Sequence, residues 1–253
     1  MIAVTRRGSI AIARITHGKA NAFDLELSSA ISDMVAQFRN GPDTGLVVTG
    51  QGTMFSAGVD LVRVVDHGEP YVREFLPALG WAFEALFACP KPVVAAVNGH
   101  AIAGGCILAC AADYRVMARG GGRIGIPELR VGVPFPVTPL EIMRFAAPAH
   151  LESLVYGGAT YSADEALAHG LVNEVTEADA LIDAAVAAAA RLAALPAVAF
   201  ELTKRQVRGP SIERIRNGAP IDREVVGAWS TPETISIIRD YIQRTFKKPA
   251  ASG

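Results

Sequence analysis

The segment from Lys91 to Cys106 decides the fold, and it reads KPVVAAVNGHAIAGGC. Pro92 to Val97 has the length and the unbroken apolar character of a strand that is buried on both faces. Asn98-Gly99 predicts a tight turn directly after that strand, and small residues follow the turn. We therefore expect a buried strand, a tight loop of small residues and a buried helix in this order.

A membrane span is the competing interpretation of this segment. The chain has no Asp, Glu, Lys or Arg from Pro92 to Ala112, and this run is long enough to cross a bilayer. Turn signals at Asn98-Gly99 and Gly104-Gly105 interrupt the run, and His100 lies at its middle. These interruptions favour the strand, loop and helix, and we expect no membrane partner.

Strands and helices alternate on both sides of this segment, which predicts a sheet covered by helices and hence the α/β class. The first two strands have the alternation of a hairpin, and Asp24 is the expected N-cap of the helix that follows them. Pro70 is expected in the first turn of the helix that ends at Phe87. The expected strands are residues 2–6, 9–15, 45–50, 92–97, 114–118 and 124–128.

The C-terminal part reads as helical throughout. Ser162 and Glu165 form a capping box and Gly170 a stop signal, which predicts a short helix over 163–169. An alanine-rich helix is expected over 178–194, and no strand signal follows Pro196. We therefore expect an α/β core over 1–195 and an all-helical part over 196–253.

Composition limits the location and the partners. The chain of 253 residues has 24 Lys plus Arg against 25 Asp plus Glu, so it lacks the basic surface that nucleic acid requires. No signal peptide is evident near the N-terminus, so we expect a cytoplasmic protein. Cys89, Cys106 and Cys110 are expected to be buried and unpaired, and no Cys/His spacing matches a zinc site.

Two loops and one glutamate are candidates for chemistry. Each loop, Met54–Leu61 and Asn98–Cys106, follows a buried strand, so their backbone N–H groups could surround one oxygen as an oxyanion hole. Glu128 has apolar neighbours, and burial would raise its pKa to that of a usable general base. The simpler interpretations are two turns and a glutamate at a helix N-terminus. His100 is expected to be a packed or solvated side chain.

These segments together resemble the crotonase superfamily, also called the enoyl-CoA hydratase/isomerase family. The resemblance is carried by FSAGVDL from Phe55, by KPVVAAVNGHAIAGGC, by ADYRVMA, by IGIPELRVG around Glu128 and by GATYSADEALAHGLVNEV. It implies a spiral of ββα turns with a C-terminal all-helical part that packs at a trimer interface. It also implies an acyl-CoA thioester as the substrate.

The same resemblance implies the site residues. Backbone N–H groups of Ala57 and Gly104 would hold the thioester oxygen, and Glu128 would be the catalytic acid/base. No metal or redox cofactor is implied, because coenzyme A arrives as part of the substrate. Ala20 and Ala22 would line the adenine and pantetheine side of the groove. The other expected substrate-binding residues are Gly58, Val59, Asp60, Leu61, Gly105, Ile107 and Pro127.

The carboxylates distinguish the possible reactions. Hydratases of the family carry two glutamates, whereas this chain has Glu128 and places Ile107 at the position of the other. One base is enough to move a double bond from C3 to C2, so the chain looks most like a Δ3,Δ2-enoyl-CoA isomerase. One alternative is a hydratase or another crotonase reaction in which Glu141 or Glu152 supplies the second carboxylate. A further alternative is an acyl-CoA-binding protein without catalysis.

Three further expectations concern assembly, the phosphates of CoA and the depth of the pocket. The resemblance implies a homotrimer or a dimer of trimers, and apolar residues of the tail favour such association because it would cover them. They are Val225, Val226, Trp229, Ile235, Ile237 and Ile238. The candidate cations for the phosphates are Lys19, Lys247 and Lys248, and the residues expected to set pocket depth are Val65, Leu76, Phe83 and Phe135.

Overall fold

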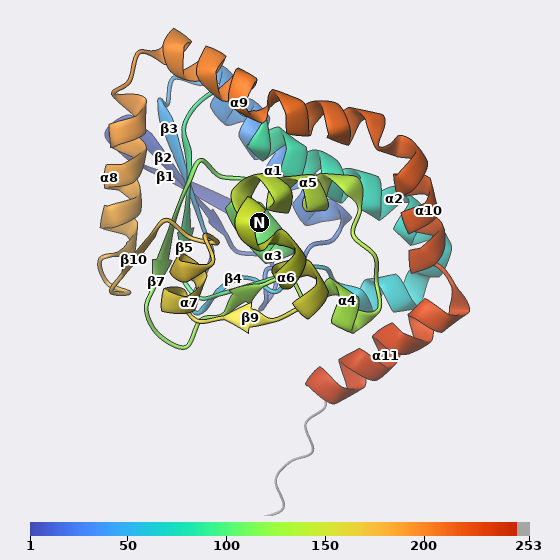
Figure 1. The fold of residues 1–253 in the computed structure, drawn as a ribbon. Coiled ribbons are helices and arrows are strands. Elements are labelled where there is room, and N and C mark those ends of the chain that lie inside the picture. Colours follow the sequence, from blue (N-terminus) through green and yellow to red (C-terminus); the bar gives the residue numbers. More distant parts are fainter. Residues whose placement is uncertain (247–253) are drawn as a thin grey trace, which may run out of the picture.

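The computed structural model describes residues 1–246 and contains two β-sheets surrounded by helices (Figure 1). The six-stranded sheet has the order β1-β2-β3-β5-β7-β10, and the four-stranded sheet has the order β4-β6-β8-β9. Neighbouring strands are parallel except for the β1–β2 and β8–β9 pairs. The strands are β1 (Ile2–Arg7), β2 (Ile10–Ile15), β3 (Gly45–Thr49), β4 (Met54–Ser56), β5 (Val93–Val97), β6 (His100–Ile102), β7 (Tyr114–Ala118), β8 (Ile124–Gly125), β9 (Thr160–Tyr161) and β10 (Glu174–Thr176).

The chain winds through these sheets as a spiral of ββα turns, which confirms the predicted fold class. β3, β5 and β7 enter the large sheet, each is followed by a strand of the small sheet, and a helix completes each turn. The helices are α1 (Leu25–Asn40), α2 (Leu61–Phe87), α3 (Gly104–Cys110), α4 (Glu128–Val131), α5 (Val137–Ala146), α6 (Leu151–Gly157), α7 (Ala163–Ala168), α8 (Leu181–Ala193), α9 (Ala197–Asn217), α10 (Ala219–Trp229) and α11 (Pro232–Phe246), with a 3₁₀ turn at Pro148–His150.

The predicted helix signals agree with the structure. Asp24 caps α1 by accepting the backbone N–H of Leu27, and Ser162 and Glu165 form the predicted capping box of α7. The backbone of Gly68 leaves the helical conformation and divides α2, so that Pro70 lies near the start of its second part. The membrane-length run is divided among β5, β6 and α3, as expected from its turn signals.

The strand prediction is wrong at four short elements. β4 and β6 lie within segments expected to be loops, and β9 and β10 lie where only helices were expected. Strand β8 contains two residues of the predicted 124–128, because Glu128 already starts α4. Two or three residues are too few to show an alternating pattern, so pairing with a neighbouring strand decides these elements.

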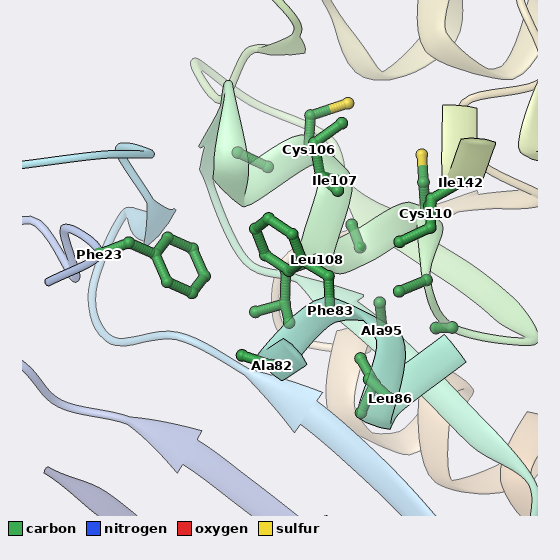
Figure 2. Packing of buried hydrophobic residues seen from close by; sticks show 14 of the residues in the cluster. Phe23, Ala82, Phe83, Leu86, Ala95, Cys106, Ile107, Leu108, Cys110 and Ile142 are labelled. Carbon is green, nitrogen blue, oxygen red and sulfur yellow. The ribbon is translucent and has the colours of Figure 1, made fainter. Parts of the chain in front are cut away.

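The core lies between the large sheet and the helices that follow its strands. Figure 2 shows Phe23 and Phe83 beside Ile107 and Leu108 of α3, and all four side chains are buried. The rings of Phe23 and Phe83 meet edge to face with centroids 5.2 Å apart. Helix α8 covers the other face of the sheet with small alanine side chains. The three cysteines are buried and unpaired, which confirms that prediction.

Helices α9 to α11 extend across α2 and α5 and are held partly by buried charge (Figure 1). Lys204 and Arg208 of α9 form ion pairs with Asp113, at 2.7 and 2.9 Å. Arg208 also donates hydrogen bonds to the carbonyl oxygens of Phe87, Ala111 and Ala112, which follow or end α2 and α3. One guanidinium group therefore joins α9 to the ends of two other helices.

The trimer prediction relied on six apolar tail residues that a partner would cover, and three of these six are already buried within the chain. Val225, Trp229 and Ile238 are buried by the chain itself, and Val226 and Ile235 pack against the same core. Of the six residues, only Ile237 is exposed, so these side chains are largely covered without a second copy. Across residues 1–246, no single helix is long and apolar enough to cross a membrane, although α8 and α9 satisfy that test as a pair that meets at 100°.

Candidate active site

A cavity of about 160 Å³ lies where the loops after β4 and β6 meet α4 and the C-terminal helices. Ten of the predicted site residues line it. They are Ala20, Ala22, Ala57, Val59, Asp60, Leu61, Gly104, Ile107, Pro127 and Glu128. The remaining wall is almost entirely apolar and consists of Val62, Leu76, Leu79, Phe83, Ile102, Ala103, Val131, Val133, Phe135, Pro136, Pro139, Trp229 and Tyr241.

Gly58 and Gly105 are not among the described residues that line this cavity, and both lie where the two loops meet. Gly58 has φ of +85°, and a Cβ atom there would lie 2.7 Å from the carbonyl oxygen of Ile102. A Cβ atom on Gly105 would lie 2.4 Å from the carbonyl oxygen of Ser56. The two glycines instead allow the two loops to pack directly against each other.

The first loop offers a different N–H donor from the one predicted. The N–H of Ala57 already donates to the carbonyl oxygen of Ala20 at 3.0 Å, so Ala57 is not the free donor. Phe23 bonds to both neighbours of Val59, donating to Gly58 and accepting from Asp60. In such a parallel bridge the N–H of the middle residue faces away from the partner strand. Val59 lines the cavity, and its N–H has no acceptor within residues 1–246.

The second loop presents the start of α3. Gly104 is the first residue of this helix, and no side chain caps it. The first N–H groups of a helix have no partner within the helix, so that of Gly104 is available at the cavity wall. The preceding Ala103 has φ of +50°, which is uncommon for a residue with a Cβ atom, while its N–H donates to Gly125.

Glu128 is a carboxylate without a cation. It is the first residue of α4, and its Oε2 atom is shielded from solvent and has no hydrogen-bond partner. Desolvation by the apolar cavity raises the pKa of Glu128 to about 8, while its own backbone N–H lowers that pKa slightly. The side chain therefore exchanges a proton near neutral pH, as the sequence predicted.

Other carboxylates are engaged elsewhere. Asp60 lies at the cavity wall, but its Oδ1 accepts the N–H groups of Val62 and Arg63 at the start of α2, both at 3.1 Å. Glu141 is buried in ion pairs with two arginines, and Glu152 is exposed on α6. Neither lines the cavity, which contradicts the alternative in which one of them supplies a second carboxylate.

A buried asparagine from the stretch Lys19-Ala20-Asn21-Ala22, which the resemblance places on the adenine and pantetheine side, holds the first loop in place. Asn21 has φ of +48°, and its Nδ2 donates to the carbonyl oxygens of Met54 and Phe55 at 3.2 and 3.1 Å. The hydroxyl of Ser56 donates back to the carbonyl oxygen of Asn21 at 2.7 Å. These bonds connect the segment with Ala20 to the strand that leads to Val59.

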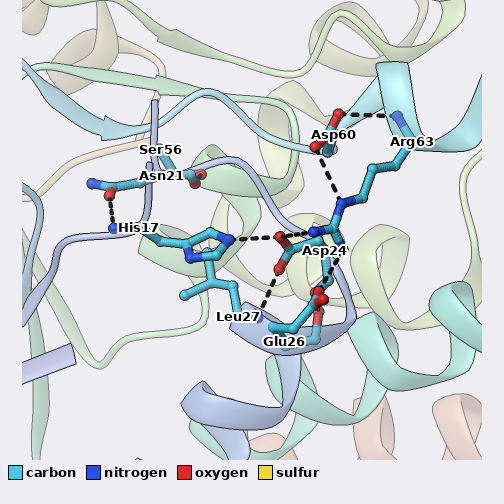
Figure 3. A network of polar contacts seen from close by, with 9 residues as sticks. His17, Asn21, Asp24, Glu26, Leu27, Ser56, Asp60 and Arg63 are labelled. Atoms are coloured by element: carbon cyan, nitrogen blue, oxygen red, sulfur yellow. Dashed lines mark hydrogen bonds and ion pairs between the residues drawn. The ribbon is translucent and has the colours of Figure 1, made fainter. Parts of the chain in front are cut away.

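A polar network lies beside this loop (Figure 3). His17 Nε2 contacts Asp24 Oδ2 at 2.6 Å, and Arg63 reaches Asp24, Glu26 and Asp60 at 3.7, 2.5 and 3.8 Å. The network ties the start of α1 to the start of α2. Lys19 is exposed in the same segment, whereas Lys247 and Lys248 lie outside the described residues.

His100 and three of the four residues expected to set pocket depth lie where the sequence predicted. His100 accepts the backbone N–H of Arg123 at 3.3 Å and does not line the cavity, so it is a packed side chain as expected. Leu76, Phe83 and Phe135 line the cavity, but Val65 does not. Trp229 and Tyr241 were not predicted to line it. No local pattern could place them there, since α10 and α11 reach the cavity through tertiary packing.

Comparison with known proteins agrees with this geometry. The family model described as enoyl-CoA hydratase/isomerase matches residues 5–233, and the chain belongs to that family, whose members act on acyl-CoA. A carnitinyl-CoA dehydratase of Salmonella paratyphi A is 34% identical over 218 residues, which cover 85% of this chain and 83% of the relative.

Solved structures show the same fold. The human mitochondrial Δ3-Δ2-enoyl-CoA isomerase superposes with a TM-score of 0.92 at 24% identity, covering 96% of this chain and 97% of that one. A probable enoyl-CoA hydratase of Mycobacterium tuberculosis H37Rv gives 0.81 at 30% identity, covering 86% and 92% of the two chains. This chain therefore has the fold of the crotonase superfamily and is an enzyme of that family.

Proposed function

We propose that this protein moves a carbon–carbon double bond from C3 to C2 of an enoyl-CoA. The observation that carries the proposal is the carboxylate of Glu128, which is unpaired among the described residues, in a largely apolar cavity whose other carboxylate, Asp60, is engaged at the start of α2. The same cavity receives the N–H groups of Val59 and Gly104, which have no acceptor within residues 1–246. This arrangement suits a reaction that moves one proton between two carbons and stabilises negative charge on one oxygen.

The reaction begins at C2 of the substrate. The thioester carbonyl oxygen accepts hydrogen bonds from Val59 and Gly104, and the Glu128 carboxylate removes a proton from C2. The electron pair of that C–H bond delocalises into a dienolate, whose negative charge is stabilised at the thioester oxygen. The Glu128 carboxylic acid then returns the proton to C4, which leaves the double bond between C2 and C3 and regenerates the carboxylate.

The environment of Glu128 matches both of its roles. A carboxylate that gains nothing from a neighbouring cation is a stronger base, and the raised pKa keeps the resulting acid protonated until C4 receives the proton. Ile107 is buried in the cavity wall where family hydratases have a glutamate. Its apolar side chain offers no hydrogen bond to a water that could add to the double bond.

The test compares two reactions of the purified protein. 3-Enoyl-CoA and 2-enoyl-CoA of the same chain length are assayed in parallel, and isomerisation is expected to be much faster than hydration. Ile107→Glu should raise hydration modestly, because the pocket is not shaped to hold a water. Hydration by the unmutated protein at the rate of isomerisation would overturn the proposal.

Hydration or dehydration is the second candidate function. It is favoured by the 34% identity with proteins named carnitinyl-CoA dehydratase. In this case Glu128 would remove or add the proton at C2, and Asp60 is the other carboxylate at the cavity wall. An Asp60→Asn variant distinguishes the two candidates. It should abolish a two-carboxylate reaction but preserve an isomerisation that uses Glu128 alone.

We also propose assembly as a homotrimer or a dimer of trimers, through residues 196–253. The supporting surface is now a stripe of exposed side chains at the start of α9 and just before it, Leu195, Val198 and Leu202. Val198 and Leu202 are four positions apart on α9 and share one face of that helix, and Leu195 is exposed just before it. Sedimentation of a monomer at micromolar concentration would contradict this assembly.

A further inference from the structure

A second, larger cavity lies directly behind the acyl cavity. Its volume is about 530 Å³; it lies between α2, α5, α9 and α10 and opens to solvent beside Trp81, which is 67% exposed. Leu76 and Pro136 line both cavities, so these two side chains form the wall between them. The other residues around the second cavity are Arg73, Pro77, Gly80, Trp81, Glu84, Thr138, Ile215, Arg216, Ala219, Asp222, Arg223, Val225 and Val226.

The elements on either side of the wall continue from one cavity to the other. On α10, Val225 lines the second cavity, and Trp229, one turn later, lines the acyl cavity. The indole N–H of Trp229 donates to the carbonyl oxygen of Pro134 at 2.9 Å, which fixes its ring beside Pro136. Leu76 is 4% exposed, so the partition at this point is one buried side chain thick.

The acyl cavity by itself has room for only a short chain. At about 160 Å³ it is close in size to an engineered cavity of about 150 Å³ that binds benzene, a molecule of six carbons. An acyl chain that extends from this cavity toward the second one meets the shared side chains of Leu76 and Pro136 first.

We propose that Leu76, together with Pro136, limits the acyl group of the substrate to about six carbons. Removal of the Leu76 side chain joins the two cavities and admits longer chains. The inference relies on the acyl-CoA site of the proposed function for the identity of the ligand. It does not depend on which reaction Glu128 performs.

Leu79 provides a matched control on the same helix. It is also a leucine, it is also 4% exposed, and it lines the acyl cavity, but it does not line the second one. Leu79→Ala therefore removes the same atoms and enlarges the acyl cavity without opening the wall. Any gain that comes only from added volume appears in both variants, whereas access to the second cavity appears only in Leu76→Ala.

The experiment measures dissociation constants by calorimetry for saturated acyl-CoA thioesters from C4 to C12. Each added methylene that enters an apolar site should tighten binding about fourfold, which corresponds to ~0.8 kcal/mol. For the unmutated protein this gain should stop near C6. For Leu76→Ala it should continue, so that C10 binds at least about tenfold more tightly than C6. For Leu79→Ala the gain in affinity should stop within about two carbons of the chain length at which it stops for the unmutated protein.

A blocking variant tests the path itself. A Cβ atom on Gly80 would lie 3.5 Å from Thr138 Oγ1, an ordinary contact, so Gly80→Leu is expected to place its side chain in the second cavity. The double variant Leu76→Ala with Gly80→Leu should lose the gain for C10. If Leu76→Ala does not fold, the milder Leu76→Val, which keeps more of the packing, replaces it. This variant should show a chain-length limit between those of the unmutated protein and the open cavity.

The proposal is overturned if the unmutated protein binds C12 with the full gain per methylene. It is also overturned if Leu76→Ala and Leu79→Ala show the same limit. Saturated thioesters undergo no double-bond shift, so the binding data can be interpreted even if the isomerase proposal is wrong. If no acyl-CoA binds at all, the identity of the ligand is wrong.

Discussion

Glu141 and the Oε2 atom of Glu128 are both shielded from water, yet the protein treats the two carboxylates in opposite ways. Glu141 of α5 receives Arg144 and Arg214 at 3.0 and 2.6 Å, one on each oxygen. Within residues 1–246, Glu128 of α4 receives no cation, and its Oε2 has no hydrogen-bond partner. Burial alone therefore does not define a catalytic carboxylate. The absence of compensation around Glu128, beside an apolar cavity, is what distinguishes it.

Replacement of Glu128 should have the largest effect. Glu128→Gln keeps the shape of the side chain but cannot accept a proton, so we expect turnover to fall by about 10² to 10⁴ while acyl-CoA binding is nearly unchanged. Steady-state kinetics and calorimetric binding measure the two quantities separately. The same change at Glu141 should leave turnover close to normal, and equal losses at both sites would break the comparison.

Removal of the N–H of Val59 is expected to have the second-largest effect on turnover. Proline at this position removes a donor that bonds to nothing else in the described chain, so Val59→Pro should lower turnover by about 10² to 10³ without loss of an internal hydrogen bond. The result sharpens the comparison, because it locates the developing negative charge on the substrate oxygen. Unchanged turnover in a folded variant would instead favour Ala57, as the sequence motif suggested.

The change of kcat/KM with pH should be smaller than the effects of these two substitutions. With a Glu128 pKa of about 8, the charged fraction grows about tenfold from pH 7 to pH 9, so kcat/KM should rise over that range. A rise centred near pH 4.5 would mean that burial does not raise the pKa of Glu128.

Stability should change with pH in the opposite direction. Unfolded Glu128 loses its proton near pH 4.5 and folded Glu128 only near 8, so the folded state binds more protons between these values. The free energy of unfolding should therefore decrease as pH rises from about 4.5 to about 8, by a few kcal/mol at most. Thermal unfolding of Glu128→Gln, which lacks this group, should not show the decrease.

Loss of the Glu141 charge should have the smallest effect, and only on stability. Glu141→Gln leaves two arginines that are each about half exposed, so water can replace the lost partner. We expect a cost of about 1 kcal/mol, or roughly 2–4 °C in Tm. A large loss of activity in a variant that remains folded would indicate that Glu141 acts on the cavity after all.

The site could be predicted from sequence where a short motif determines a backbone. The motifs around Ala57, Gly104 and Glu128 located the two loops and the acid that meet at the cavity. They did not identify which amide is free, because the bond from Ala57 to Ala20 joins segments that are distant in sequence. Nor did they distinguish glycines that contact substrate from glycines that allow two loops to touch.

The fold was predictable in its long elements and not in its short ones. Apolar runs such as β5 and the alanine-rich α8 have enough residues to show their period. β9 and β10 form because a neighbouring strand is present, which no local pattern records. The same reason hid Trp229, whose place in the cavity depends on how α10 returns across α2.

Arg208 connects the C-terminal helices to α3, the helix that begins at Gly104, and this connection affects how these elements unfold locally. Its guanidinium group binds carbonyl oxygens just after α3, whose first residue is Gly104 at the cavity. If α9 detaches, the seven residues of α3 lose the bonds at their far end. The amide protons of α3 and α9 should then exchange with solvent as one cooperative unit, so the rigidity of the amide donor would depend on a helix that never reaches the substrate.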